Sequence, residues 1–239
     1  MMKNQVLFYP NLEKIINTDQ ALYVIGSLSH PSKIPAMGYS LPAAECKTGA
    51  IMEDIPGSTC CKENCYAKRG WYPKRQTIQN AMYRRLEAIK DPLWVDAMTF
   101  MIKWYSCKYF RWHDSGDLQS VNHFAKICTI AENCADCWFW LPTREYDIVK
   151  KYIKLAGNKP KNLVVRFSGM MIDGPSPLPL AKSLGCVAST VSTKGDHNCK
   201  ASTKKVLVKN GQNEEQYGFC GSCRDCWNPE IENIVYKFH

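Results

Sequence analysis

Closely spaced cysteines carry the sharpest chemical signal in the sequence. Cys220, Cys223 and Cys226 form a C-x2-C-x2-C run, and in bacterial ferredoxins this spacing brings three thiolates to three corners of a cubane cluster. Cys199 is available upstream as a fourth ligand. Zinc ribbons usually present two separated C-x2-C pairs, so the run favours an iron–sulfur cluster, although His197 would allow a zinc site of three cysteines and one histidine.

A second group of cysteines lies nearer the N-terminus. Cys61 and Cys65 have an x3 spacing with an aromatic residue directly after the second cysteine, which resembles the start of a radical-SAM loop. The third cysteine of such a loop is expected at position 68, where the chain has Lys68. Cys46 could supply the third thiolate, leaving one iron open or bound by a non-cysteine group. The spacing favours Cys61 over its neighbour Cys60 as the ligand.

Polar residues gather immediately after the short apolar runs, and the longest stretch is His113-Asp-Ser-Gly-Asp117. Because the carboxyl ends of parallel strands meet at one edge of a sheet, we expect these residues to share one rim. We predict catalytic roles for His113, Asp114 and Asp117, which would orient a substrate. The residues predicted to bind a cofactor there are Ser115, Gly116, Thr143, Arg144, Arg166 and Ser168.

Ordinary structural roles are alternatives for several rim residues. Asp117 and Thr143 stand where helix N-caps are common. Arg144 and Arg166 could instead pair with a carboxylate at the rim.

The elements that must position these residues alternate between apolar runs and amphipathic stretches, as in βα units around a parallel sheet. Strands are expected at 109–113, 138–141, 163–167 and 186–190, and helices at 77–90 and 93–107. A helix capped by Ser120 is predicted after the first strand. A second helix, capped by Thr143 and ended by Gly157, follows the second strand, and Gly185 ends a shorter helix after the third strand. The prediction is a single α/β domain, residues 1–239. Its βα core at about 76–193 forms a partial or complete TIM-like barrel between irregular Cys-rich segments at about 30–75 and 194–239.

Composition narrows the class of protein. The chain has 239 residues, is 45% hydrophobic, contains thirteen cysteines and has a formal net charge of +9. We see no signal peptide and no membrane span, so we expect a cytoplasmic protein, in a reducing compartment where structural disulfides are rare. Two clusters would lower the net charge to roughly +6, because their thiolates are deprotonated.

The remaining cysteines are expected to be structural. Cys134 and Cys137 have metal-like spacing but precede a strand, at the end of the barrel opposite the rim. Cys107, Cys128 and Cys186 fall in predicted helix or strand interiors, where a thiol packs as a small hydrophobe.

Several motifs together suggest a family: Cys46-Lys-Thr-Gly, Cys65-Tyr-Ala-Lys-Arg-Gly-Trp-Tyr, Arg111-Trp-His-Asp-Ser-Gly-Asp, Leu141-Pro-Thr-Arg and Cys220-Gly-Ser-Cys-Arg-Asp-Cys-Trp. Over about residues 30 to 239 the chain resembles the phage "gene product 88-like" proteins, a cysteine-rich family distantly similar to radical-SAM barrels. This resemblance implies the fold and the clusters more than any reaction, and it implies the host cytoplasm as location. Lys68 departs from the radical-SAM triad of cysteines.

The function expected from these residues is that of an iron–sulfur protein with two clusters, both 4Fe–4S, acting as a radical-SAM-like or other cluster-dependent enzyme. S-adenosylmethionine is a candidate cofactor, and a small-molecule ligand and an electron donor are the expected partners. A non-catalytic electron carrier would not require the His and Asp groups of the rim.

The alternative is a cluster- or zinc-stabilised module that binds nucleic acid or a host protein. Aromatic side chains would stack on bases beside basic groups that neutralise phosphate. No basic run is long enough to be specific, so nucleic acid is the less favoured partner. The residues considered for this surface are Trp71, Tyr72, Trp227, Lys74, Arg75 and Arg224.

Overall fold

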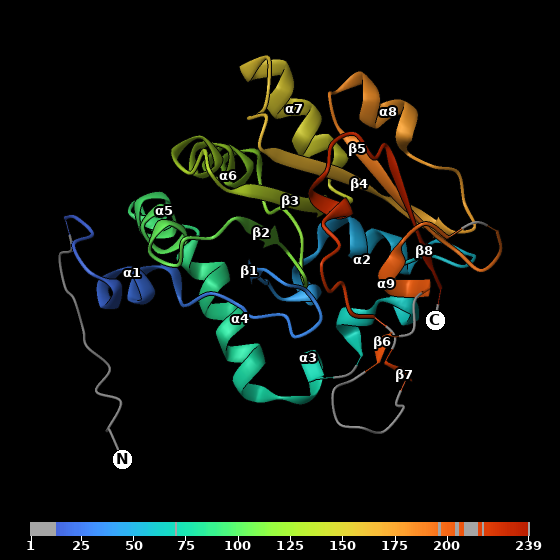
Figure 1. Cartoon of the computed structure of the whole chain (residues 1–239), viewed down its shortest axis with the longest axis horizontal. Coiled ribbons are helices and arrows are strands. Elements are labelled where there is room, and N and C mark those ends of the chain that lie inside the picture. Colours follow the sequence, from blue (N-terminus) through green and yellow to red (C-terminus); the bar gives the residue numbers. More distant parts are fainter. Residues whose placement is uncertain are drawn as a thin grey trace.

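One parallel sheet of six strands organises the molecule, in the order β1-β2-β3-β4-β5-β8 (Figure 1). This computed structural model describes residues 13–69, 71–195, 197–203, 206–207, 215–216 and 218–238. For seven of these it describes only the backbone: Lys62, Trp71, Thr203, Val206, Leu207, Glu215 and Gln216. The strands of the sheet are β1 (Met37–Tyr39), β2 (Tyr109–Trp112), β3 (Trp138–Thr143), β4 (Leu163–Ile172), β5 (Val187–Ser192) and β8 (Asn233–Lys237). Outside it, β6 (Val206–Leu207) and β7 (Glu215–Gln216) pair antiparallel.

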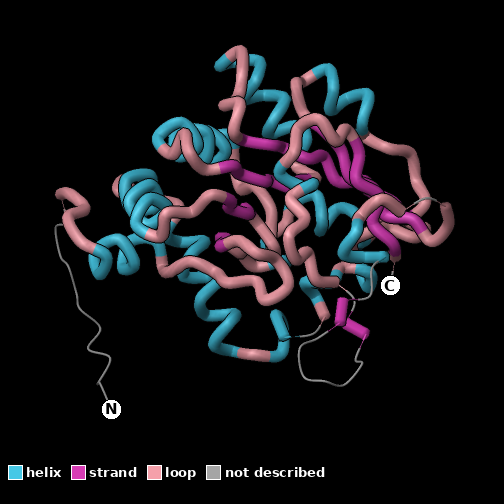
Figure 2. The backbone as a smooth tube through the Cα atoms, in the orientation of Figure 1, coloured by secondary structure: helices cyan, strands magenta, loops and turns pink. Residues whose placement is uncertain are grey.

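Helices follow most of the strands and gather mainly along one side of the sheet (Figures 1 and 2). The α-helices are α1 (Thr18–Ile25), α2 (Lys47–Glu53), α3 (Trp71–Lys74), α4 (Gln76–Ala88), α5 (Trp94–Trp104), α6 (Val121–Asn133), α7 (Tyr146–Ala156), α8 (Leu178–Ser183) and α9 (Lys200–Thr203). Short 3-10 helices lie at Ala43–Glu45, Lys62–Asn64, Tyr66–Lys68 and Asp225–Trp227. Helices α5, α6 and α7 pack side by side.

Alternation along the strands separates two faces of the sheet. Phe110, Trp112, Phe139 and Leu141 are fully buried in the core shared with α1, α5, α6 and α7. Successive strand residues point to opposite faces, so Arg111 and its neighbours in that row face the other way. We call the helix-covered side the outer face and the opposite side the inner face.

The cysteine-rich C-terminal segment covers the inner face. The ring of Trp227 packs edge-on against Tyr109 of β2 and Trp140 of β3, with ring centroids 5.5 and 5.3 Å apart. The indole N–H of Trp227 donates to the carbonyl of Phe110 at 2.9 Å. An irregular chain far along the sequence therefore forms the second layer over β2 and β3.

The predicted α/β class and the parallel sheet are confirmed, with strand ends shifted by a few residues. Ser120 caps α6 by accepting a hydrogen bond from the His123 amide at 3.0 Å, and Gly157 ends α7 at a φ of 79°. The expectation that Thr143 caps α7 is wrong, because Glu145 occupies that position. β4 continues to Ile172, past the expected end at 167, through an irregularity in its pairing with β5.

The strands that the structure describes form an open sheet with β1 and β8 at its edges. Their nearly sequential order is that of one wall of a (βα) barrel. Neither edge is bare: Ser29 pairs with Gly38 of β1, and on the far side Val235 of β8 bonds to Asn198 and Cys199. Such coverage blocks pairing with another chain.

Candidate metal centres and the adjoining rim

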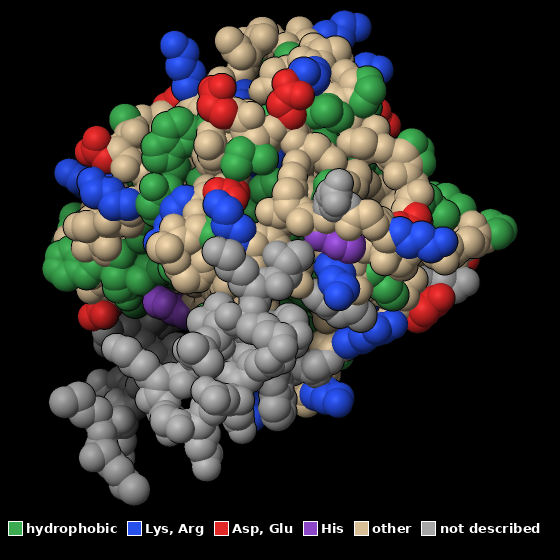
Figure 3. Space-filling view, turned by 45° about the vertical axis from the view of Figure 1, so that its right-hand side comes forward, with side chains coloured by type: hydrophobic (Ala, Val, Ile, Leu, Met, Phe, Trp, Pro, Cys, Tyr) green, Lys and Arg blue, Asp and Glu red, His purple; other side chains and the backbone are tan. Residues whose placement is uncertain are grey.

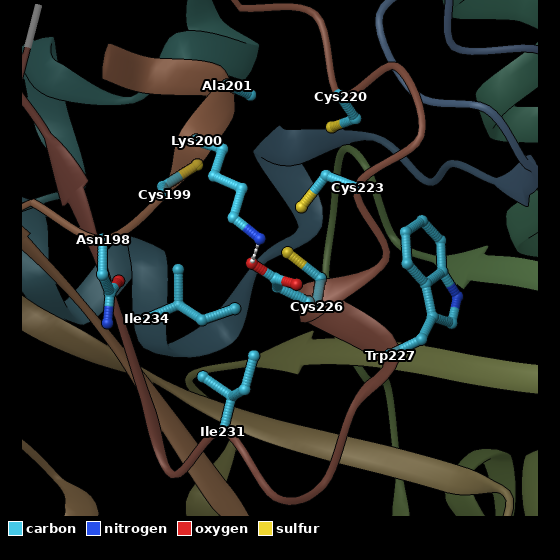
Figure 4. A pocket seen from close by; sticks show the side chains of 11 residues that line it. Asn198, Cys199, Lys200, Ala201, Cys220, Cys223, Cys226, Trp227, Ile231 and Ile234 are labelled. Atoms are coloured by element: carbon cyan, nitrogen blue, oxygen red, sulfur yellow. Dashed lines mark ion pairs between the residues drawn. The ribbon is translucent and has the colours of Figure 1, made fainter. Parts of the chain in front are cut away.

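Four cysteines from two segments surround one cavity of about 80 Å³ on the inner face. Cys199 precedes α9, and Cys220, Cys223 and Cys226 follow in the C-terminal loop. Figure 4 shows their four sulfur atoms directed toward a common space above Ile231 and Ile234. None of the four forms a disulfide bond in the described part of the chain. The structure therefore brings together the four C-terminal residues that the sequence predicted as metal ligands.

Arg166 of β4 anchors the C-terminal cysteine loop through hydrogen bonds to its backbone. Its Nε donates to the carbonyl of Cys226 at 2.9 Å, and its two terminal nitrogens donate to four further carbonyls. Those acceptors belong to Ala188, Asp225, Asn228 and Ile231. Arginine has five N–H donors, so every one is used on backbone. The prediction that Arg166 binds a cofactor finds no support in this arrangement; the side chain positions the cysteine loop.

Polar contacts complete the surroundings of the C-terminal cysteines. The hydroxyl of Tyr236 lies 3.5 Å from the Cys226 sulfur. Burial raises the pKa of the Cys226 thiol to about 12, against the opposing charges of Arg166 and Arg111. Bound iron or zinc would deprotonate such a thiol outright. Beside the cavity, Lys200 forms an ion pair with Asp225 at 3.1 Å, joining the segment of Cys199 to the loop of the other three cysteines (Figure 4).

The N-terminal cysteines also converge, around the first turn of α2. A Cβ atom placed on Gly49 would lie 2.9 Å from Cβ of Cys46 and 3.9 Å from the sulfur of Cys61. These two cysteines are thus neighbours despite the fifteen positions that separate them in the sequence. Burial raises the pKa of the Cys46 thiol, and the nearby charges of Asp117, Cys65 and Cys61 raise it further. Cys46 and Cys61 therefore lie close together, and Cys65 is near enough for its charge to act on Cys46.

Cys60 lies beside this group and faces Arg144. Burial raises the pKa of its thiol, whereas the charge of Arg144 and a hydrogen bond from it act in the opposite direction. The amide of Cys60 donates to the carbonyl of Met170 in β4 at 2.9 Å. Its backbone is therefore fixed to the sheet, and the structure gives Cys60 a basic partner of its own.

Asp117 joins the ends of two neighbouring strands. One carboxylate oxygen accepts from the Thr143 hydroxyl at 2.5 Å and the Leu118 amide at 2.7 Å, and the other accepts from the Arg144 amide at 2.9 Å. Burial nevertheless raises the pKa of Asp117 to about 6, with the charge of Glu145 adding to the effect. A carboxyl that titrates near neutral pH can exchange protons with a ligand.

Arg144 and Glu145 extend this network toward the N-terminal cysteines. Nε of Arg144 donates to the carbonyl of Gly169 at 3.1 Å, and Glu145 accepts from the Thr48 amide in α2 at 2.8 Å. The predicted rim residues Asp117, Thr143 and Arg144 therefore lie beside the N-terminal cysteines. Glu145 was not predicted; its position directly after Arg144 was the available signal.

The side chain of His113 points toward the helices of the outer face. Its φ of 51° is in the left-handed region, and its ring packs against that of His123 in α6, with centroids 5.3 Å apart. The side chain is buried, and within the described residues neither ring nitrogen has a hydrogen-bond partner. Burial, with the charge of Arg111, lowers its pKa to about 3. The structure thus places His113 toward the helices, which does not favour its predicted catalytic role.

Asp114 is bound on both sides by residues of the N-terminal segment. Tyr72 donates to its carboxylate at 2.6 Å, Ser29 donates at 3.4 Å, and the Tyr66 hydroxyl donates to its carbonyl. Tyr66 directly follows Cys65, so the contact ties the N-terminal cysteine loop to the rim. Asp114 thus anchors that loop.

The other residues predicted to bind a cofactor are Ser115, Gly116 and Ser168. The hydroxyl of Ser115 is buried without a partner in the described part of the chain, and Gly116 has a φ of 81° beside Leu41. Ser168 lies inside β4, paired in register with Ser189, and not after the strand as expected. Its hydroxyl accepts from that of Ser189 at 3.5 Å. These side chains shape the inner face without forming a charged site.

Two of the aromatic residues proposed for a stacking surface have partners within the protein. Trp227 is 3% exposed, and the hydroxyl of Tyr72 is bound to Asp114. The side chain of Trp71 lies outside the described part of the chain. On the face in Figure 3, lysines and arginines are scattered among other side chains and form no continuous track.

Most of the remaining cysteines are buried, but Cys107 and Cys186 lie outside the helix and strand interiors where they were predicted. Cys134 and Cys137 are buried at the start of β3, at the edge opposite the rim, where Asn162 donates to both of their carbonyls. Cys128 lies in the core under α6, and Cys107 and Cys186 lie just before β2 and β5. Within the described residues, no three His, Cys, Asp or Glu side chains are grouped so that they could hold a single metal ion.

Comparison with protein families gives a match over most of the chain. The profile of the family described as "Gene product 88" matches residues 11–229. Neither the curated proteins nor the solved structures contain a significant match. No helix in the described part of the chain is long and apolar enough to cross a membrane.

Proposed function

The chain belongs to the gene product 88 family, whose name assigns no activity, and we propose that it is an iron–sulfur protein with two clusters that acts as a cluster-dependent enzyme. The observation that carries the proposal is the set of four cysteine sulfurs facing one cavity of about 80 Å³. The nearly sequential sheet is compatible with the wall of a partial (βα) barrel, the architecture expected for a radical-SAM-like enzyme.

The donor set of the C-terminal cavity fits a cluster better than a single ion. Zinc draws four thiolates to within about 2.3 Å of one centre, whereas a cubane of four irons and four sulfides needs room between its cysteine ligands. Cys199, Cys220, Cys223 and Cys226 surround such room, and their cavity has a largely apolar floor. With four thiolates this cluster would be saturated. It would serve electron transfer and stabilise the loop.

The N-terminal group supports a cluster with an open position. Cys46, Cys61 and Cys65 provide three thiols. Lys68, at the position of the third radical-SAM cysteine, forms an ion pair with Glu53 of α2. An open or exchangeable position is where a metal centre binds substrate. We propose that a small molecule binds there, with S-adenosylmethionine as the first candidate.

Residues of the rim would supply the polar contacts to that ligand. The carboxyl of Asp117 has a pKa of about 6 and lies close enough for its charge to act on the Cys46 and Cys61 thiols. Asp117 is therefore suited to take or give a proton near neutral pH. Arg144 contributes a fixed positive charge beside the same cysteines. A bound cluster would supply one-electron chemistry.

A purely structural role for the clusters, in a module that binds nucleic acid, is supported less well. Stacking on bases requires exposed aromatic rings, and Trp227 is buried between Tyr109 and Trp140. The polar network at Asp117 has no use in such a module.

Anaerobic purification with iron, sulfide and zinc analysis tests the proposal. We expect about eight irons and eight sulfides per chain. Cys223→Ala and Cys65→Ala should each remove about half, and Cys61→Ala should match Cys65→Ala. Cys60→Ala is the matched control and should retain the full iron content. A colourless protein with stoichiometric zinc and no sulfide would refute the proposal.

Ligand binding is tested on the same preparations by electron paramagnetic resonance with and without S-adenosylmethionine. A ligand at the N-terminal cluster should change only the signal that disappears in Cys65→Ala. A response confined to the signal that survives in Cys65→Ala would reverse the assignment of roles. No response of either signal would remove S-adenosylmethionine as the candidate.

A further inference from the structure

Arg111 lies on the inner face of β2, with partners on two sides. Its guanidinium carbon stands 4.4 Å above the centre of the Trp140 ring in β3. A planar guanidinium stacks well on an indole and is charged at every physiological pH. The stacking fixes a permanent positive charge at one place on the sheet.

Toward the N-terminal cysteines, Arg111 is linked through a tyrosine. Its Nη2 donates to the hydroxyl of Tyr66 at 3.2 Å, and that hydroxyl donates in turn to the carbonyl of Asp114. Tyr66 begins the 3-10 helix Tyr66–Lys68, whose N-cap is Cys65. Arg111 therefore fixes the residue that directly follows a proposed cluster ligand.

Toward the C-terminal cysteines, Arg111 is linked through two tryptophans. Trp140, under the guanidinium, packs against Trp227 with centroids 5.3 Å apart, and Trp227 directly follows Cys226. The stacked rings therefore connect the Arg111 guanidinium to the residue that directly follows Cys226.

Arg111 differs from Arg166 in the use of its N–H donors. All five donors of Arg166 are bound to carbonyls, whereas Nε of Arg111 is buried and has no partner among the described residues. A buried donor without an acceptor is costly. A thiolate-bound cluster carries net negative charge and sulfur acceptors, so cluster loading would offset this cost.

We propose that Arg111 is a positioning residue shared by both metal sites, whose single positive charge stabilises the reduced form of each cluster. The inference rests on the proposed presence of two clusters. Reduction adds one negative charge to a cluster, and a nearby cation favours that added charge, more so in a poorly hydrated interior. Arg111 would therefore raise both reduction potentials, so that each cluster is more easily reduced by an electron donor.

Potentiometric titration of the anaerobic protein, followed by electron paramagnetic resonance, tests this role. Arg111→Met removes the charge but keeps apolar bulk over Trp140, and should shift both cluster potentials to more negative values. Arg111→Lys keeps the charge and should retain potentials close to wild type. Lys154→Met removes one exposed positive charge from α7 and should shift neither potential.

The outcomes separate this inference from the proposed function. Two clusters with unchanged potentials in Arg111→Met would overturn the shared role and leave the proposed function standing. A shift of one potential alone would also overturn it. If Arg111→Met fails to assemble clusters, Arg111→Lys decides, because a large negative shift with the charge retained would exclude the electrostatic role. Wild-type protein without iron would overturn both.

Discussion

The carboxylate of Asp117 accepts a 2.5 Å hydrogen bond from the hydroxyl of Thr143, and this contact ties the loop after β2 to the end of β3. Its second oxygen is bound to the amide of Arg144, next along the chain. The loop that carries Asp117 thus cannot move without the loop that carries Arg144. Two neighbouring rim loops behave as one unit beside the N-terminal cysteines.

The raised pKa of Asp117 predicts a pH dependence of stability. Burial lifts its pKa from an ordinary value near 4 to about 6, so the folded protein holds a proton that the unfolded chain releases. The resulting stabilisation is fully present below about pH 4 and is lost as the pH rises through about 6. It amounts to about 2–3 kcal/mol. Urea unfolding of wild type and Asp117→Asn between pH 4 and 8 should show this loss only in wild type.

The control for that comparison is Asp147→Asn, an exposed carboxylate in the first turn of α7. Its unfolding free energy should follow the pH dependence of the wild type. Identical pH profiles for wild type and Asp117→Asn would show that the carboxyl titrates normally.

The titration of His113 should give the opposite pH dependence of stability. Its pKa is lowered to about 3 because the buried ring cannot accommodate a charge. The neutral ring contributes stability above about pH 6.5, and this is lost as the pH falls toward 3, by on the order of 3–5 kcal/mol. His113→Asn keeps a residue that tolerates a positive φ. Acid unfolding should therefore begin at lower pH in His113→Asn than in wild type, and an unchanged acid midpoint would contradict the assignment.

Gly116→Ala should destabilise the rim strongly. The residue has a φ of 81°, and an added Cβ would lie 2.5 Å from Cβ of Leu41 and 2.8 Å from its carbonyl oxygen. We expect a loss of about 2–4 kcal/mol in unfolding free energy, from strain and overpacking together. Gly185→Ala is the matched control, with a φ of 61° and no atom within 4 Å of the added Cβ, and should cost about 1–2 kcal/mol. Equal costs in thermal unfolding would argue against the close approach of Leu41.

Arg166→Met should release the C-terminal cysteine loop. The substitution leaves five carbonyl groups without their donor, and we expect the free energy of unfolding to fall by about 3–5 kcal/mol. About half of the bound iron should disappear, and proteolysis should reach the loop at 218–231. Arg84→Met, which removes an exposed arginine that donates to the Gly26 carbonyl, should change neither. Full iron retention in Arg166→Met would show that the loop assembles without this anchor.

Local patterns predicted the middle of the fold well. The apolar runs before His113 and after Cys137 form strands because each buries one face against helices and the other against the C-terminal loop. β1 and β8 were not foreseen. β1 has three residues, and β8 finds its partner β5 across the cysteine loop, a pairing that no local period reveals.

The site was predicted in part, and the reasons are physical. Cys46 and Cys61 were expected near one another and are neighbours at the first turn of α2, whereas their role as ligands stays a prediction. His113 and Arg166 have surroundings that position along the chain alone did not indicate. A left-handed φ places the His113 side chain toward α6, and the partners of Arg166 lie about sixty residues further along the chain.

That separation between Arg166 and its partners has a consequence for biosynthesis. The ribosome completes β4 and the N-terminal cysteines well before it makes Cys226, which lies 60 residues after Arg166. During that interval the guanidinium of Arg166 has none of its loop carbonyls, so β4 cannot yet be sealed against water at the inner face. The order of translation therefore completes the N-terminal cysteines first, and leaves closure of the inner face to the last strand synthesised.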